Sequence, residues 1–131
     1  ALPGAVEKVA EFQGKAPQAL VTGSTTAQAA AVLESLQITD RFLHVVACDQ
    51  YSKGKPDPEP YIIAAGKLGV DPSACLVLED SPSGVTAAKK AGMKVVGIHE
   101  GNKGKYNIKH ADYEVASLLE LDWDKLVARF A

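Results

Sequence analysis

The chain has 131 residues, of which 47% are hydrophobic and 23% charged, enough apolar material for one sizeable core but hardly for two. Its formal net charge is -2 with both signs interspersed, so it lacks the basic surface that a nucleic-acid partner requires. No apolar stretch approaches the roughly 20 residues of a membrane span, so we expect one soluble, cytoplasmic domain over residues 1–131 with no membrane partner.

The first half of the chain alternates between helical and strand patterns. Apolar residues at helical spacing follow Pro3 and stop at Gly14, the kind of residue that ends a helix. A later stretch is rich in β-branched and aromatic residues and is too short for a helix. In chain order, these patterns predict a helix over 3–14, a strand over 19–21, a helix over 29–36 and a strand over 42–48.

The second half continues the alternation. Gly69 ends one helical pattern, and Ser81 and Pro82 form a typical start for another, as cap and first helical residue. The predicted elements are a helix over 61–68, a strand over 75–78, a helix over 82–92, a strand over 95–98, a loop over 99–109 and two short helices within 116–130. Near-continuous apolar strands between helices predict an α/β fold with a Rossmann-like parallel sheet covered by helices on both faces.

Polar residues that suit a phosphate and a divalent cation follow three of the predicted strands. Because ligands bind outside the carboxyl ends of parallel strands, we expect these residues to converge. The Thr22 hydroxyl, the Gly23 backbone and the first N–H groups of the next helix suit phosphate oxygens. Lys55 offers a positive charge, and Glu79 and Asp80 are oxygen donors of the kind that Mg²⁺ takes.

These segments resemble the motifs of the haloacid dehalogenase (HAD) superfamily, most closely its β-phosphoglucomutase-like phosphatases. Residues 20–24 are similar to the family's second motif, 54–61 to its third and 78–85 to its fourth, in the family's order and spacing. The resemblance runs from about Pro3 to near the C-terminus. It implies a HAD core fold whose sheet is built around a central nucleophile strand.

The resemblance also implies a function and roles for the residues. The intact protein would be a magnesium-dependent phosphatase or phosphomutase that acts on small phosphorylated metabolites, such as sugar phosphates, through an aspartyl-phosphate intermediate. Thr22 and Lys55 would be catalytic, and they would bind phosphate together with Gly23. Asp80 would bind Mg²⁺, with Glu79 as a further ligand or as a partner behind it.

The family's first motif, an Asp-x-Asp that supplies the nucleophile, has no counterpart in these residues. The only Asp-x-Asp, at 122–124, lies in helical sequence where Asp122 suits a helix cap. We therefore expect the nucleophile strand and the family's cap domain to lie outside residues 1–131, and this chain alone to be inactive. The lost strand would leave unpaired backbone in the sheet, which a second chain or a missing N-terminal segment would complete.

Two other classes of protein remain open. A non-catalytic binding or assembly module could hold phosphate and metal without a nucleophile. A receiver-like signalling domain has similar groups but in another order, with its acidic residues before Thr and Lys-Pro. Other residues receive structural interpretations: Cys48 and Cys75 as buried free thiols, and His44, His99 and His110 as structural or surface residues.

Overall fold

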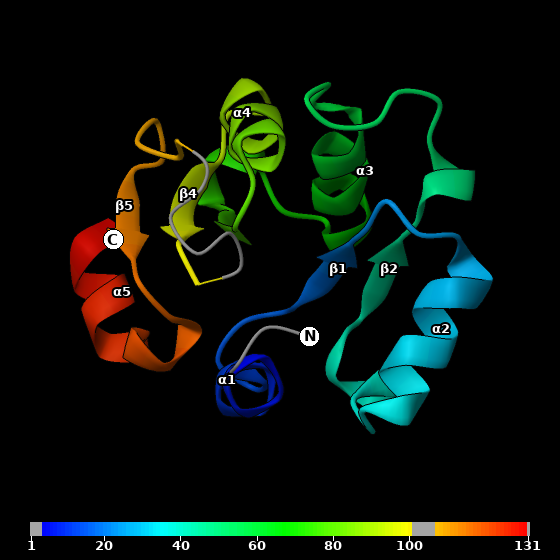
Figure 1. Ribbon diagram of the computed structural model, residues 1–131, viewed down its shortest axis with the longest axis horizontal. Coiled ribbons are helices and arrows are strands. Elements are labelled where there is room, and N and C mark those ends of the chain that lie inside the picture. The colour runs from blue at the N-terminus through cyan, green and yellow to red at the C-terminus, as the bar shows by residue number, and fades with distance from the viewer. Residues whose placement is uncertain (1–3, 101–106, 131) are drawn as a thin grey trace.

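The computed structural model describes residues 4–100 and 107–130, in which helices and strands alternate as predicted (Figure 1). The helices are α1 (Ala5–Phe12), α2 (Thr26–Ser35), α3 (Glu59–Leu68), α4 (Pro82–Lys90) and α5 (Trp123–Phe130). The strands are β1 (Ala19–Val21), β2 (His44–Val46), β3 (Leu76–Glu79), β4 (Lys94–Ile98) and β5 (Tyr113–Val115). Short 3-10 turns occupy Thr39–Arg41, Cys48–Gln50, Pro72–Ala74 and Leu118–Glu120.

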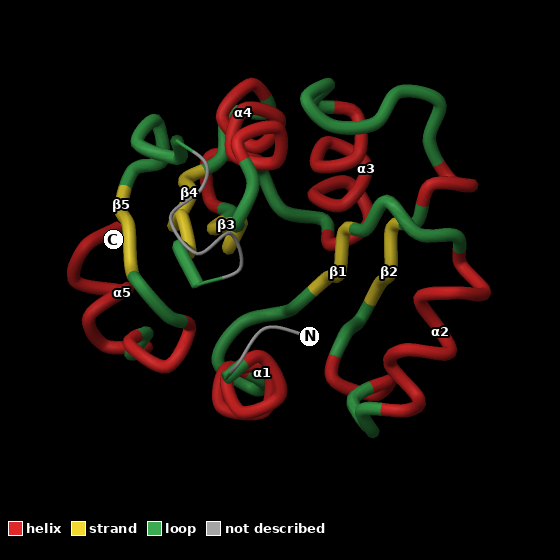
Figure 2. The backbone as a smooth tube through the Cα atoms, in the orientation of Figure 1, coloured by secondary structure: helices red, strands yellow, loops and turns green. Residues whose placement is uncertain are grey.

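The described strands form two hydrogen-bonded sheets, and every pairing in them is parallel. In one sheet β1 pairs with β2, and in the other the order is β3-β4-β5. Figure 2 shows β1 and β3 facing each other across the break between the sheets. The break lies between the strands that end next to Thr22 and at Glu79, where the sequence predicts a missing strand.

The helices α3 and α4 cover one face of the strands. Their buried side chains form a cluster that includes Tyr61, Val77, Val85 and Val95, and Val21 of β1 packs against it. Because α3 contacts β1, β2 and α4, it connects the two sheets on this face.

The opposite face of β4 and β5 is covered by α1, α5 and the turn before α5. Phe12 and Trp123 meet there with ring centroids 5.8 Å apart. Val96 and Ile98 of β4 point into this second cluster, whereas Val95 points into the first. Helices therefore cover both faces of the parallel strands, which confirms the predicted α/β fold class.

Side chains at the helix ends explain why the predicted boundaries are close to the observed ones. Ser81 caps α4 by accepting a hydrogen bond from the Gly84 amide at 3.1 Å, with Pro82 in the first turn. Gly69 ends α3 in the left-handed conformation, with φ of 68°. These local signals depend on neighbours within one helical turn, so they can be read from the sequence.

The structure corrects several predictions. It adds a strand, β5, which the sequence analysis missed, and β2 is shorter than predicted. Cys48 and Cys75 are free but lie outside the strands and are only half-buried, so the prediction of buried thiols is wrong. Part of the predicted loop 99–109, residues 101–106, lies outside the described residues. No helix in the described ranges is long and apolar enough to cross a membrane.

Candidate active site

The predicted site residues follow the carboxyl ends of three strands. Thr22 comes directly after β1, Lys55 lies in the loop between β2 and α3, and Glu79 ends β3 with Asp80 next. The structure brings Lys55 and Glu79 into direct contact, with 2.8 Å between Nζ and Oε2.

Tyr51 links Thr22 to the loop that carries Lys55. Its hydroxyl donates a hydrogen bond to the backbone carbonyl of Thr22 at 3.0 Å. Its ring also lies against Gly54, because a Cβ on that glycine would be 3.4 Å from the ring. The turn after β1 and the Lys55 loop are therefore fixed relative to each other by a side chain that the sequence analysis did not single out.

The turn after β1 presents a hydroxyl and an open stretch of backbone. The Thr22 amide donates to the Val46 carbonyl at 2.9 Å, which extends the β1–β2 pairing by one residue. The Ser24 amide donates to Thr22 Oγ1 at 3.1 Å, so the hydroxyl acts as an acceptor there and can donate its hydrogen to a ligand oxygen. Apart from Gly23 and its two chain neighbours, no described residue has an atom within 4 Å of where a Cβ on Gly23 would be, which lets a ligand approach this backbone closely.

The start of α2 differs from the prediction that its first N–H groups would be free for an anion. The Thr26 amide donates to Asp49 Oδ1 at 3.1 Å. The Gln28 amide donates to Thr25 Oγ1 at 3.2 Å, and the Thr25 amide donates to Gln28 Oε1 at 2.9 Å. Protein groups already satisfy these amides, so the backbone at Gly23 is the better candidate for contact with an anion.

Glu59 fastens the loop that carries Lys55. Its carboxylate accepts hydrogen bonds from the Ser52 amide at 2.6 Å, the Lys53 amide at 2.9 Å and the Ser52 hydroxyl at 3.0 Å. The bond from the Lys53 amide is the main reason that the pKa of Glu59 lies below its ordinary value. The Lys55–Pro56 peptide bond in this loop is cis.

Glu79 is a buried carboxylate with four protein donors. It is 8% exposed. Its Oε2 accepts from Lys55 Nζ at 2.8 Å and from the Tyr61 hydroxyl at 2.5 Å. Its Oε1 accepts from the Asp80 amide at 3.2 Å and the Ser81 hydroxyl at 3.3 Å. Burial raises the pKa of Glu79, but Lys55 and the other donors outweigh it and hold the pKa below the ordinary value.

Asp80 has the opposite electrostatic environment. Partial burial, followed by the negative charge of Glu79, raises the pKa of Asp80 above its ordinary value. A cation beside Asp80 would reduce both costs, which fits a Mg²⁺ ligand. The four donors of Glu79 occupy its lone pairs and favour the role of a partner behind Asp80 over that of a metal ligand. Within the described residues, no cluster of three or more His, Cys, Asp or Glu side chains could hold a metal by itself.

The sequence analysis also missed two residues that shape the environment of Glu79. The pattern of α3 marked Tyr61 only as an apolar position, yet its hydroxyl reaches the carboxylate. A Cβ on Gly84 would lie 2.0 Å from Glu79 Cδ, so only glycine allows this approach. Both residues lie within the segments that resemble the third and fourth family motifs, which is the one signal that could have drawn attention to them.

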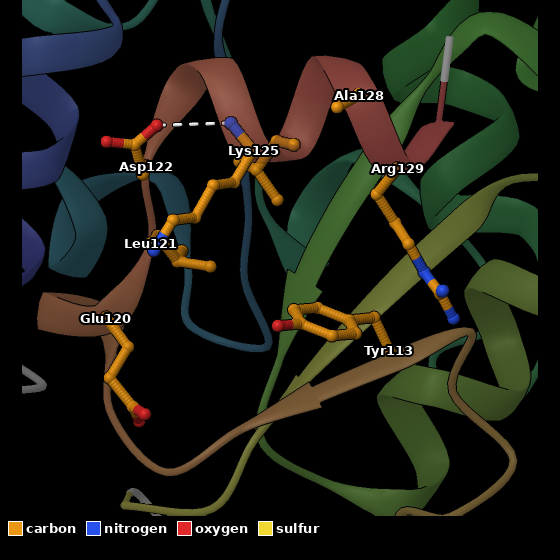
Figure 3. A pocket seen from close by; sticks show the side chains of 8 residues that line it. Tyr113, Glu120, Leu121, Asp122, Lys125, Ala128 and Arg129 are labelled. Carbon is orange, nitrogen blue, oxygen red and sulfur yellow. Dashed lines mark hydrogen bonds between the residues drawn. The ribbon is translucent and has the colours of Figure 1, made fainter.

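A separate hollow between β5 and α5 contains none of the predicted site residues (Figure 3). The Arg129 guanidinium lies 5.3 Å from the centroid of the Tyr113 ring and donates to the Asp112 carbonyl at 3.2 Å. The Lys125 amide is used in the cap of α5 by Asp122, at 3.1 Å. These contacts stabilise the end of the chain against β5.

Comparison with known proteins finds similarity to hydrolases. A family model described as haloacid dehalogenase-like hydrolase matches residues 1–92. The fructose-1-phosphate phosphatase YqaB of Escherichia coli is 39% identical over 71% of this chain and 50% of its own length. The validoxylamine A 7'-phosphate phosphatase of Streptomyces hygroscopicus is 34% identical over 92% of this chain and 56% of its own.

A solved structure agrees with the sequence matches. A β-phosphoglucomutase from Clostridium difficile superposes with a TM-score of 0.86 and 27% identity, covering 98% of this chain and 56% of that one. The chain thus spans about half the length of the curated relatives that it matches.

Proposed function

Because this chain belongs to the haloacid dehalogenase-like hydrolases and resembles their β-phosphoglucomutase-like members, we propose that it supplies the phosphate-binding and metal-binding part of a phosphatase or phosphomutase site. The observation that carries the proposal is the Lys55–Glu79 contact of 2.8 Å beside Asp80. The substrate is a small phosphorylated metabolite, such as a sugar phosphate. The names of the relatives, two phosphatases of phosphorylated small molecules, support this choice.

Thr22 and Gly23 hold the phosphoryl oxygens. The Thr22 hydroxyl donates to one oxygen while its Oγ1 stays anchored by the Ser24 amide. The backbone at Gly23, which faces open space, accommodates another oxygen at close range. Fixed donors of this kind orient the phosphoryl group for in-line attack.

Lys55 neutralises negative charge on the phosphoryl group and on the attacking carboxylate. Its Nζ already has one fixed partner, Glu79, so the ammonium does not reorganise when charge develops. Glu79 keeps Lys55 in place and adds negative potential next to Asp80.

Asp80 is the residue of this chain that holds Mg²⁺. A magnesium ion takes one or two carboxylates together with waters and substrate oxygens, so a single strand-end aspartate contributes one part of its ligand set. When bound, the metal offsets the charge of the phosphoryl group. The fit rests on the carboxylate oxygens of Asp80 directly after β3, next to the Lys55–Glu79 pair, and a cation there would also offset the raised pKa of Asp80.

The nucleophile comes from outside residues 1–131. An aspartate on a strand between β1 and β3 attacks phosphorus and forms an aspartyl phosphate as the leaving oxygen departs. That strand, from a missing N-terminal segment or from a second chain, also completes the break between the sheets. In this proposal residues 1–131 are one core domain fragment, and the 131-residue chain alone is inactive.

A second candidate is a non-catalytic binding or assembly module. The break between β1 and β3 favours it, because within residues 4–100 and 107–130 no strand pairs with the facing edges of β1 and β3. Only the first candidate, the phosphatase or phosphomutase, would turn over a phosphorylated substrate. The test is hydrolysis of p-nitrophenyl phosphate with and without Mg²⁺ by the natural gene product that contains these residues, beside its Lys55→Ala and Asp80→Ala variants. Magnesium-dependent turnover that falls by about two orders of magnitude or more in both variants supports the phosphatase, and near-normal rates in both would refute it.

A further inference from the structure

The Tyr61 hydroxyl is a buried polar group within an apolar cluster. Tyr61 is 5% exposed, and its ring packs with Val77 and Val85 in the core beneath α3 and α4. A phenylalanine would fill almost the same space without bringing a polar group into the core. A buried hydroxyl is costly unless it is hydrogen-bonded, and here it donates to Glu79 Oε2 at 2.5 Å. The hydroxyl is therefore explained by this contact rather than by packing.

The contact fixes one end of a carboxylate that is confined on several sides. Lys55 and Tyr61 share Oε2 of Glu79, while the Asp80 amide and the Ser81 hydroxyl share Oε1. On the α4 side, the lack of a side chain at Gly84 lets the carboxylate lie where a Cβ would be 2.0 Å away. The orientation of the carboxylate is set by these donors together with the space at Gly84.

Lys55 depends on that orientation. A lysine side chain has many rotamers, so a defined position for its ammonium requires fixed partners. Within the described residues, Nζ contacts Glu79 Oε2 at 2.8 Å and the face of the Tyr61 ring, 5.3 Å from its centroid. Tyr61 therefore acts on Lys55 directly through its ring and indirectly through its hydroxyl and Glu79.

We propose that Tyr61 is a positioning residue, whose hydroxyl holds the Glu79 carboxylate in the orientation that places the Lys55 ammonium. The inference deepens the proposed function and rests on it for its catalytic meaning. Removing only the hydroxyl leaves the ring, the core packing and the cation–π contact in place. It removes one of two donors on Oε2, so Glu79 can turn and Lys55 is no longer confined to one position.

A test on the natural gene product that contains these residues needs no catalysis. The rate at which an acetylating reagent modifies Lys55 is measured by mass spectrometry and divided by the rate at Lys53, which lies in the same loop. In Tyr61→Phe this ratio should rise about fivefold, the factor that corresponds to the net worth of one hydrogen bond. The matched control is Tyr113→Phe, which removes a hydroxyl from a half-exposed tyrosine in β5 and should leave the ratio unchanged.

A second variant perturbs Glu79 from the side of α4. Gly84→Ala forces the carboxylate away from α4, so it should also raise the Lys55 ratio while Tyr61 is intact. Unchanged ratios in folded Tyr61→Phe would overturn the proposal. If that variant does not fold, as judged by circular dichroism, an unchanged ratio in Gly84→Ala overturns it instead.

The catalytic meaning is tested separately on the natural gene product. Tyr61→Phe should lower kcat for p-nitrophenyl phosphate about tenfold and leave KM within twofold, because the loss falls on the transition state. If Tyr61→Phe raises the Lys55/Lys53 modification ratio but the natural protein shows no turnover, Tyr61 positions Lys55 and the proposed function is refuted. Normal turnover together with an unchanged ratio would refute the role of Tyr61 and leave the proposed function standing.

Discussion

Replacing Lys55 with methionine should destabilise the chain by leaving a buried carboxylate without its charged partner. The side chain of Glu79 is 9% exposed and that of Lys55 is 21% exposed, so water compensates little for the loss of the 2.8 Å contact. Methionine keeps an unbranched apolar stem of similar length, which separates the loss of charge from the loss of packing.

The magnitude follows from the donors that remain. Breaking a buried ion pair on one side costs about 3–5 kcal/mol, and one hydrogen bond to a charged group contributes about 1.5–3 kcal/mol. Glu79 retains hydrogen bonds from the Tyr61 hydroxyl, the Ser81 hydroxyl and the Asp80 amide. The expected loss of unfolding free energy therefore falls in the lower of these two ranges. We expect the free energy of unfolding of Lys55→Met to fall by about 2 kcal/mol at pH 7, measured by urea denaturation with circular dichroism.

The effect should depend on pH in a definite direction. Because the folded pKa of Glu79 lies below its ordinary 4.5, the carboxylate stabilises the native chain above that pH and loses this contribution as the pH falls through the folded pKa. The difference between Lys55→Met and the native chain should therefore shrink in acid. The control is Lys53→Met in the same loop, expected within about 0.5 kcal/mol of the native chain. Equal effects of the two substitutions at pH 7, or a difference that does not shrink in acid, would refute the reasoning.

Other predictions test the surroundings of the site. Gly84→Ala should lower stability by about 1–3 kcal/mol in calorimetry, because the new Cβ overlaps Glu79, and an unchanged melting temperature would contradict the tight approach. Burial raises the pKa of Asp112, but Lys89, at 2.7 Å, and a backbone amide hold that pKa below 3.8. In urea denaturation, Asp112→Asn should therefore lower the free energy of unfolding at pH 7, and this loss should vanish as the pH falls through the pKa of Asp112 in the folded chain. Thr22→Val in the natural gene product should reduce phosphatase turnover at least tenfold without loss of folding, and a normal rate would remove Thr22 from the site. EDTA should abolish that turnover and Mg²⁺ restore it, so full activity in EDTA would exclude the metal.

Local signals made much of the fold predictable. Gly69, Ser81 and Pro82 mark helix ends through contacts within a single turn, and the apolar runs before Thr22 and Glu79 form parallel strands. The strand β5 was missed because its three residues include two exposed ones and show no apolar run.

The positions of the candidate residues in the fold were predictable, whereas their contacts were not. Thr22, Lys55 and Asp80 follow strand ends, which the sequence alone can indicate. The contact between Tyr61 and Glu79 joins residues 18 positions apart, and Asp49 reaches the Thr26 amide across 23 positions. Such contacts depend on how helices pack against strands, which the periodicity of one segment does not specify.

The break between the two sheets bears on where the nucleophile lies. β1 and β3 face each other without pairing in the described residues, and this chain spans only about half the length of the matched relatives. Both observations agree with a site whose nucleophile is carried by residues beyond 1–131.

Identification of the residue that is phosphorylated during turnover tests most directly the claim that the nucleophile lies outside residues 1–131. The natural gene product is mixed with a phosphomonoester and Mg²⁺, quenched in acid, reduced with borohydride to fix any acyl phosphate, and mapped by mass spectrometry. We predict a single modified aspartate outside residues 1–131. Modification of an aspartate, serine or histidine within residues 1–131 would contradict the claim.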